Sequence, residues 1–133
     1  MSRWRDARPG SHKQCQANKA KTFVALHQRS AAFVIPNPWD TGTARILASL
    51  GFEALATTSA GFAFSHGRLE GRVTRDEALA HCRVIAEATP LPVSADLENG
   101  YGARIEDLAE TYRRAAGSGL VGASIEEYRG EPG

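Results

Sequence analysis

The sequence PLPVSADLENGYG, residues 90–102, places a short apolar run directly before a group of acids and glycines. The run over residues 90–96 predicts a buried strand, with Asp96 and Glu98 at its carboxyl end. The glycines that follow predict a turn away from the sheet. Like charges at such an edge call for a balancing cation or ligand, although an ordinary solvated loop also explains them. The rest of the chain has to separate these two interpretations.

Length and charge limit the classes of protein to consider. The 133 residues, 42% of them hydrophobic, suffice for one small domain with a core. Six basic residues and one acid give residues 1–21 a charge of +5, which leaves −4 on the remainder. Nucleic-acid binding needs clustered Lys and Arg, so we expect no nucleic-acid partner. Because no run of 18 apolar residues occurs, we also expect no membrane partner and a cytoplasmic location.

The first residues differ in composition from the body. Residues 1–13 lack the apolar segment of a secretory signal, and we predict a disordered basic extension, with a mitochondrial presequence as the alternative. The folded unit is expected over residues 14–133. Cys15 and Cys82 lie 67 positions apart without a CxxC partner, so neither a disulfide framework nor a zinc site is indicated.

Helical and strand patterns alternate through the body. Helices are predicted over about residues 15–29, 41–50, 74–88 and 105–116, and strands over residues 32–36, 52–59, 90–96 and 120–126. Asp40 is expected to cap the second helix, and Thr74 with Glu77 has the capping-box pattern. The third helix is expected to turn inward Leu79, Cys82, Ile85 and Ala86. Residues 61–75 predict a long loop, either a lid over a ligand or an ordinary surface loop.

Strands joined by helices predict a parallel sheet. The pattern leaves open whether this sheet is an open doubly wound sheet or part of a (β/α)8 barrel. In both architectures polar groups at the carboxyl ends of the strands meet at one edge. Those ends carry Asn37 and Asp40, Thr57, Thr58 and Ser59, Asp96 and Glu98, and Glu126 and Glu127. Acids that converge from separate strands favour a divalent cation held by oxygen ligands.

Three segments agree in order and spacing with one known family over about residues 18–131: PNPWDTGTARILASLGFEALATTSAG, RDEALAHCRVIAEATPLPVSADLENGYG and AAGSGLVGASIEE. Together they resemble the first half of a phosphoenolpyruvate mutase/isocitrate lyase superfamily enzyme. The resemblance implies the first half of a (β/α)8 barrel, with four parallel strands and intervening helices. It also implies Mg2+, or Mn2+, as cofactor and a small 2-oxo or 2-hydroxy acid as substrate.

The resemblance assigns roles to three acids. Asp96 corresponds to the central metal-associated aspartate, Glu98 to the second acid of that motif, and Glu126 to the acid that ends the fourth strand. All three are predicted metal ligands, and Asp96 and Glu98 are predicted catalytic residues. The commoner pattern of the family is Asp-x-Asp, whereas this chain has Asp96-Leu97-Glu98. A Glu at the second position reaches further, so it could contact the metal directly or through water.

The resemblance also predicts a substrate site. Ser59, with the backbone amides of Ala60 and Gly61, corresponds to the group that grips the substrate's carboxylate or phosphonate, and Ser59 is a predicted catalytic residue. Small residues suit this task because an anion needs exposed N–H groups. Glu70 is a further predicted substrate-binding residue, at a place where the family often has Asp.

The fold alone does not decide the reaction, which could be that of a lyase, a decarboxylase or a phosphonomutase. A second hypothesis is a non-catalytic, truncated half-barrel that at most binds metal or associates with itself. Open edges and an apolar inner face lead us to expect a homo-oligomer.

Overall fold

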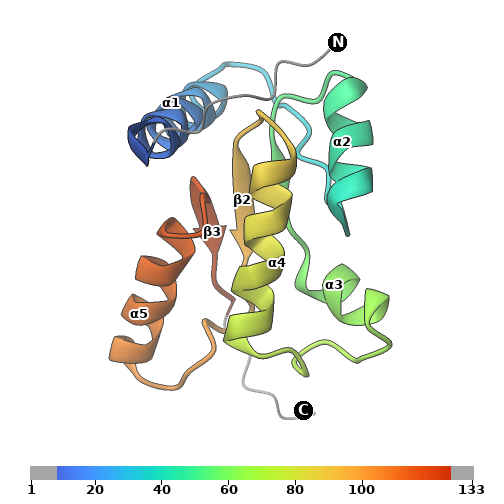
Figure 1. Cartoon of the computed structure of the whole chain (residues 1–133), viewed down its shortest axis with the longest axis vertical. Coiled ribbons are helices and arrows are strands. Elements are labelled where there is room, and N and C mark those ends of the chain that lie inside the picture. Colours follow the sequence, from blue (N-terminus) through green and yellow to red (C-terminus); the bar gives the residue numbers. More distant parts are fainter. Residues whose placement is uncertain (1–8, 127–133) are drawn as a thin grey trace.

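Helices separate the strands along residues 9–126, the part of the chain that the computed structural model describes (Figure 1). The elements are α1 (Pro9–His27), α2 (Thr41–Ser49), β1 (Leu55–Ala56), α3 (Ser59–Ser65), α4 (Arg75–Ala88), β2 (Val93–Asp96), α5 (Ile105–Ala116) and β3 (Gly122–Ser124). This order confirms the predicted α/β class. Residues 1–8 of the predicted disordered extension lie outside the described residues.

One parallel sheet has the strand order β1-β2-β3. Asp96 pairs with Ser124, so β2 and β3 end level, whereas β1 ends two residues earlier, where Ala56 pairs with Ser94. The parallel arrangement was predicted, and it requires the crossover helices that are observed. Polar residues that follow these strands therefore meet at one edge of the sheet.

The described part of the chain has three strands where four were predicted. Residues 32–36 form no strand, although the N–H of Ala56 donates to the carbonyl of Pro36 at 3.1 Å. The Asn37 side chain donates to the carbonyl of Ala56, also at 3.1 Å. Pro36 and Pro38 have no N–H, so the segment follows the edge of β1 without building a regular ladder.

The predicted strand over residues 52–59 is also shorter in the structure. Only Leu55 and Ala56 are in β1, and α3 begins at Ser59. Thr58 is the N-cap of α3, because its Oγ1 accepts from the N–H of Gly61 at 3.2 Å. The predicted loop over residues 61–75 therefore starts with helix, and its irregular part is confined to the residues between α3 and α4.

Helix α1 begins at Pro9, so residues 9–13 are helical and not part of a disordered extension. It covers the edge where the strands begin. Lys19 Nζ donates to the carbonyls of Ala86 and Thr89, at 3.0 and 2.8 Å, where α4 ends. Gln16 Nε2 donates to the carbonyls of Ala116 and Leu120, both at 2.8 Å, where α5 ends. The helix thus supplies donors to carbonyls that helix ends leave unpaired.

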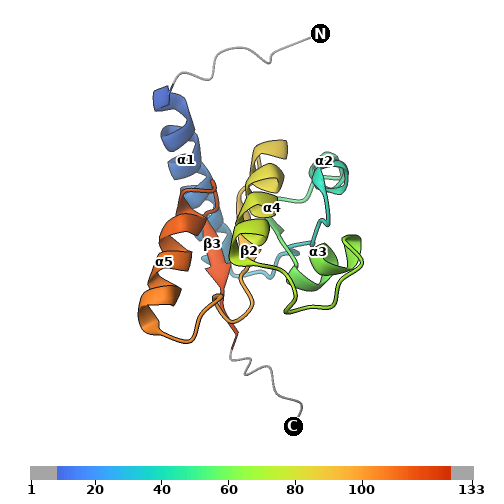
Figure 2. The same ribbon diagram turned by 60° about the horizontal axis from the view of Figure 1, so that its bottom comes forward.

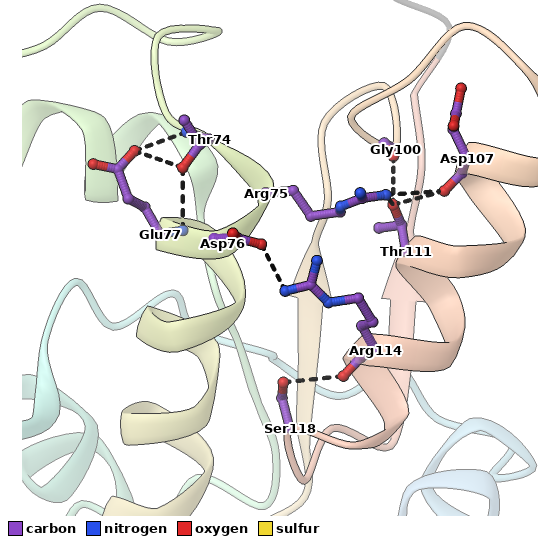
Figure 3. Close-up of polar contacts among 9 residues, drawn as sticks. All are labelled: Thr74, Arg75, Asp76, Glu77, Gly100, Asp107, Thr111, Arg114 and Ser118. Atoms are coloured by element: carbon purple, nitrogen blue, oxygen red, sulfur yellow. Dashed lines mark hydrogen bonds and ion pairs between the residues drawn. The ribbon is translucent and has the colours of Figure 1, made fainter.

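Helix α4 lies over β2 in both views (Figures 1 and 2) and contacts α2, α3 and α5. Its predicted inward residues are all buried, and they pack with the apolar residues of the sheet: Leu79, Cys82, Ile85 and Ala86 against Leu55, Val93, Ala95 and Leu97. The predicted Thr74–Glu77 capping box is present (Figure 3). Asp40 caps α2 as predicted. The helical spacing of apolar residues and the N-cap residues were thus sufficient to place these helices from the sequence.

Helix α5 faces the sheet with a polar residue at the centre of its buried side. Thr111 is fully buried, and its Oγ1 lies 2.7 Å from the Gly100 carbonyl, which it reaches as a donor (Figure 3). Gly100 has φ +79°, and a side chain there would collide with Leu108. The apolar residues Ile105 and Tyr112 of the same helix are exposed, Ile105 by 80%. Thr111 therefore attaches α5 to the turn that follows Asp96 and Glu98.

No helix within residues 9–126 is long and apolar enough to cross a membrane. The cytoplasmic location stays a prediction.

We expect Thr111→Val to lower the free energy of unfolding by about 1–3 kcal/mol, because it leaves the buried Gly100 carbonyl without its donor. Urea unfolding followed by circular dichroism measures this loss. Thr22→Val is the matched control, since Thr22 is exposed on α1 and bonds only within its own helix. Equal stabilities of the two variants would contradict the anchoring role of Thr111.

Candidate active site

The carboxyl ends of β1 and β2 are joined by a contact between Ser59 and Asp96. Asp96 ends β2, and Ser59 is the first residue of α3. The Asp96 Oδ2 accepts from the Ser59 backbone N–H at 3.0 Å and from the Ser59 hydroxyl at 2.6 Å. The Asp96 Oδ1 accepts from the backbone N–H of Glu98 at 3.0 Å. The structure thus brings together two of the predicted catalytic residues, and it uses three donors to orient the Asp96 carboxylate.

Glu70 approaches the same hydroxyl from the loop between α3 and α4. Its Oε1 lies 2.7 Å from Ser59 Oγ, which is buried, while Glu70 itself is exposed. A hydroxyl has one proton to donate, so it can satisfy only one of the two carboxylates at a time. The structure thus brings together Ser59 and Glu70, two predicted substrate-binding residues, and their role in binding stays a prediction. The two carboxylates carry more negative charge than this single hydroxyl donor can balance.

Glu98 is the most constrained acid of this group. Its φ of +48° lies in the left-handed region, which costs about 1–3 kcal/mol for a residue other than glycine. The Oε1 atom is buried and has no hydrogen-bond partner among the described residues. Burial raises the pKa of Glu98, and the neighbouring carboxylates of Glu70 and Asp96 raise it further. A buried acceptor without a donor is an arrangement that a cation would satisfy.

Glu126 reaches the site through its backbone. Its N–H donates to the carbonyl of Glu98 at 2.7 Å, and the residue is exposed. Within residues 9–126, no group of three or more His, Cys, Asp or Glu side chains is placed to hold a metal ion. The predicted ligand set of Asp96, Glu98 and Glu126 is therefore not gathered into a shell in this arrangement. The atoms near Ser59 that could coordinate a metal are carboxylate oxygens, which are ligands that Mg2+ and Mn2+ prefer.

The predicted anion cradle at the start of α3 is already partly engaged. The Ser59 N–H donates to Asp96, and the Gly61 N–H donates to Thr58 Oγ1. Gly61 is packed against the indole of Trp39, and any side chain at Gly61 would collide with that ring. Small residues are thus required here for close packing. Ala60, the third predicted member, lies between them and is half-buried.

A narrow cavity lies beneath the acids. Its walls include Ser59, Asp96 and Glu98 together with Tyr101, His81 and Cys82. Burial raises the pKa of Cys82 to about 11, so this residue is a thiol at neutral pH and an unsuitable nucleophile. Burial also lowers the pKa of His81, whose ring stacks on Phe62 with 4.0 Å between centroids. The His81 Nε2 atom is buried without a hydrogen-bond partner among the described residues, and Cys82 Sγ lies 3.6 Å from Thr57 Oγ1.

Sequence reasoning placed Thr57 and Thr58 at a strand end but missed that they support Asp96 and the start of α3. Thr57 Oγ1 accepts from the N–H of Asp96 at 3.3 Å, and Thr58 caps α3. The N-cap role of Thr58 could have been predicted from the sequence, because threonine is a favoured N-cap residue. Trp39 gave no such signal, since its contact with Gly61 joins segments that are distant in sequence.

Comparison with known proteins places this chain in a family. A family model described as phosphoenolpyruvate phosphomutase matches residues 23–133. The 2,3-dimethylmalate lyase of Eubacterium barkeri is 32% identical over 112 residues, which make up 83% of this chain and 38% of that enzyme.

Solved structures agree in fold. A Burkholderia cenocepacia J2315 protein, described as a lyase/mutase, is 56% identical with a TM-score of 0.86 over 89% of this chain and 42% of its own. Oxaloacetate acetylhydrolase is 30% identical with a TM-score of 0.76 over 82% of this chain and 40% of its own. The chain thus spans about two fifths of the length of these relatives, and their fold confirms the predicted barrel-type class. By the extent of these matches, the chain belongs to the phosphoenolpyruvate phosphomutase family, within the phosphoenolpyruvate mutase/isocitrate lyase superfamily.

Proposed function

We propose that this chain carries part of a Mg2+-dependent active site that makes or breaks a C–C or P–C bond in a small 2-oxo or 2-hydroxy acid. The observation that supports it is the Ser59–Asp96 contact, which joins a hydroxyl donor to an oriented carboxylate across two strand ends. Relatives described as a lyase, a hydrolase and a lyase/mutase leave the reaction open within this range.

Asp96 and Glu98 would hold the cation through their carboxylate oxygens, with Glu126 as a third ligand after its side chain turns inward. When bound, Mg2+ or Mn2+ would act as a Lewis acid that stabilises negative charge developing on a substrate oxygen. The unpartnered Glu98 Oε1 and the surplus carboxylate at Ser59 support this assignment. The Ser59 hydroxyl would donate a hydrogen bond to the substrate's carboxylate or phosphonate. This bond would fix the orientation of the reacting carbon.

The proposal predicts that Mn2+ binds the chain and that Asp96→Asn weakens the affinity by about tenfold or more. Titration followed by electron paramagnetic resonance counts free Mn2+ directly. Asp76→Asn is the matched control, because Asp76 is exposed on α4 and pairs with Arg114 away from the site (Figure 3). Equal Mn2+ affinities in the two variants would argue against a metal role for Asp96.

Turnover tests the substrate class. The chain is incubated with Mg2+ and, in separate reactions, oxaloacetate, isocitrate, 2-methylisocitrate and phosphonopyruvate, and products are followed by mass spectrometry. Product formation that EDTA abolishes supports the proposal, and activity that survives excess EDTA contradicts the metal dependence.

A site built for a cation should destabilise the metal-free protein. The pKa of Glu98 is raised on folding, so its contribution to stability is complete below the unfolded value of 4.5 and is lost as pH rises through the folded pKa. We therefore expect Glu98→Gln to raise the unfolding midpoint at pH 7, and the advantage to shrink below pH 4.5. Thermal unfolding across this pH range measures it, with the exposed Glu87→Gln as control. A lower midpoint at pH 7 would contradict the prediction.

A second candidate function, a half-barrel that associates with itself, is favoured by the two helices at the lateral borders of the described unit. Ile46 of α2 and Leu50, its C-cap residue, are exposed by 59% and 69%, and Ile105 and Tyr112 of α5 are also exposed. Helix α4 lies between these helices and contacts both (Figure 1). Apolar side chains on both flanks require cover, and a second copy of the chain would provide it.

Association through these flanks predicts that the purified chain has a mass in solution above that of a monomer. Ile105→Lys should shift it toward the monomer, because a charge in an apolar contact is unfavourable. Val84→Lys is the control, since Val84 is exposed on the central helix α4. Light scattering after gel filtration gives the masses, and a monomeric parent chain would contradict this candidate.

A further inference from the structure

We propose that Glu70 is an internal competitor at the anion site: in the ligand-free chain its carboxylate occupies the Ser59 hydroxyl that a substrate anion would use, and it leaves when that anion binds. This inference rests on the proposed function, in which Ser59 holds the anionic group of the substrate. It gives Glu70 a role opposite to direct substrate binding.

The hydrogen-bond capacity of Ser59 is the first argument. Its Oγ already lies 2.6 Å from Asp96 Oδ2 and 2.7 Å from Glu70 Oε1, although it has one proton to donate. A third carboxylate at this hydroxyl would find no donor, so an entering anion must displace one of the two. The bound state therefore differs from the ligand-free state in the position of Asp96 or of Glu70.

The second argument identifies Glu70 as the group that leaves. Asp96 is part of β2 and accepts from two backbone N–H groups in addition to the Ser59 hydroxyl. Glu70 is exposed, and Ser59 is the hydrogen-bond partner found for its side chain within the part of the chain that the structure describes. Moving Glu70 breaks one contact, whereas moving Asp96 breaks three and disturbs a strand.

The loop that carries Glu70 is built to allow this movement. Glu70 lies between Gly67 and Gly71, whose φ angles of +65° and +76° are in the left-handed region that glycine adopts readily. The loop is attached at its start, where Arg68 pairs with Glu77 at 2.8 Å. Leu69 at the tip is 70% exposed. The Glu70–Ser59 bond is thus a tether between the tip of this loop and the site. A second contact runs from the backbone N–H of Gly71 to the Glu98 carboxylate, where it opposes the rise in the pKa of Glu98.

Charge favours the same exchange. Glu70 lies close enough to Glu98 to be the second cause, after burial, of the raised pKa of Glu98. An entering dianion would add to this repulsion if Glu70 stayed in place. Departure of Glu70 removes one negative charge as the ligand brings its own.

The test combines two measurements on the parent chain and on Glu70→Ala, Glu70→Gln and the exposed control Glu87→Ala. Hydrogen exchange of the amides of residues 67–73 is measured without ligand, and oxalate affinity is measured by calorimetry with Mg2+ present. We expect faster exchange in Glu70→Ala and oxalate binding about tenfold tighter than in the parent, because the competing charged hydrogen bond is gone. Glu70→Gln should fall between these two, and the control should match the parent.

Each of the other possible results would contradict a specific part of the proposal. Unchanged exchange in Glu70→Ala would overturn the tether whether or not oxalate binds. Faster exchange with equal or weaker oxalate binding would overturn the competition and make Glu70 a direct ligand-binding residue. Oxalate binding in none of the four proteins would contradict the proposed function itself, and the competition would fall with it.

Discussion

The contact between Ser59 and Asp96 is the constraint on which the arrangement of the site depends. It is a pair of charge-assisted bonds, at 2.6 and 3.0 Å, between the end of β2 and the start of α3. The first residue of the short helix α3 is thereby fixed to the sheet, while Phe62 and Ala63 pack the helix on Val73 and Ala78. The same bonds orient the Asp96 carboxylate, so the position of α3 and the geometry of the acid are set by one interaction.

The helices that pack on the sheet hold the carboxyl ends of its strands at one edge. Helix α4 packs its apolar face on β1 and β2, and Thr111 of α5 attaches the Gly100 turn that follows the acids. Helix α1 acts at the opposite edge, where Lys19 and Gln16 donate to carbonyls at the ends of α4 and α5. Apolar packing thus holds the elements together, while a few side-chain hydrogen bonds fix the positions of their ends.

The acids themselves work against stability. Glu98 combines a left-handed backbone, a buried oxygen without a partner and a pKa raised by burial and by neighbouring carboxylates. Such a combination is unfavourable in a ligand-free protein, because each feature raises the energy of the folded state. A bound cation would balance both the burial and the like charge. Local strain at this turn is therefore consistent with a binding role and is difficult to explain as structural support.

The sequence by itself determined the α/β class, the caps at Asp40 and Thr74, the inward face of α4 and the family, because these depend on side-chain period, local hydrogen bonds and sequence motifs. It placed Ser59, Asp96 and Glu98 at one edge, since parallel strands end together.

Only the tertiary structure decided that residues 32–36 leave the ladder, that α3 starts at Ser59, and that α5 buries Thr111 while Ile105 stays exposed. The pairing of Ser59 with both Asp96 and Glu70 was equally out of reach. These outcomes depend on which atoms meet across distant segments, and that is settled by packing and by the limited number of donors at each point.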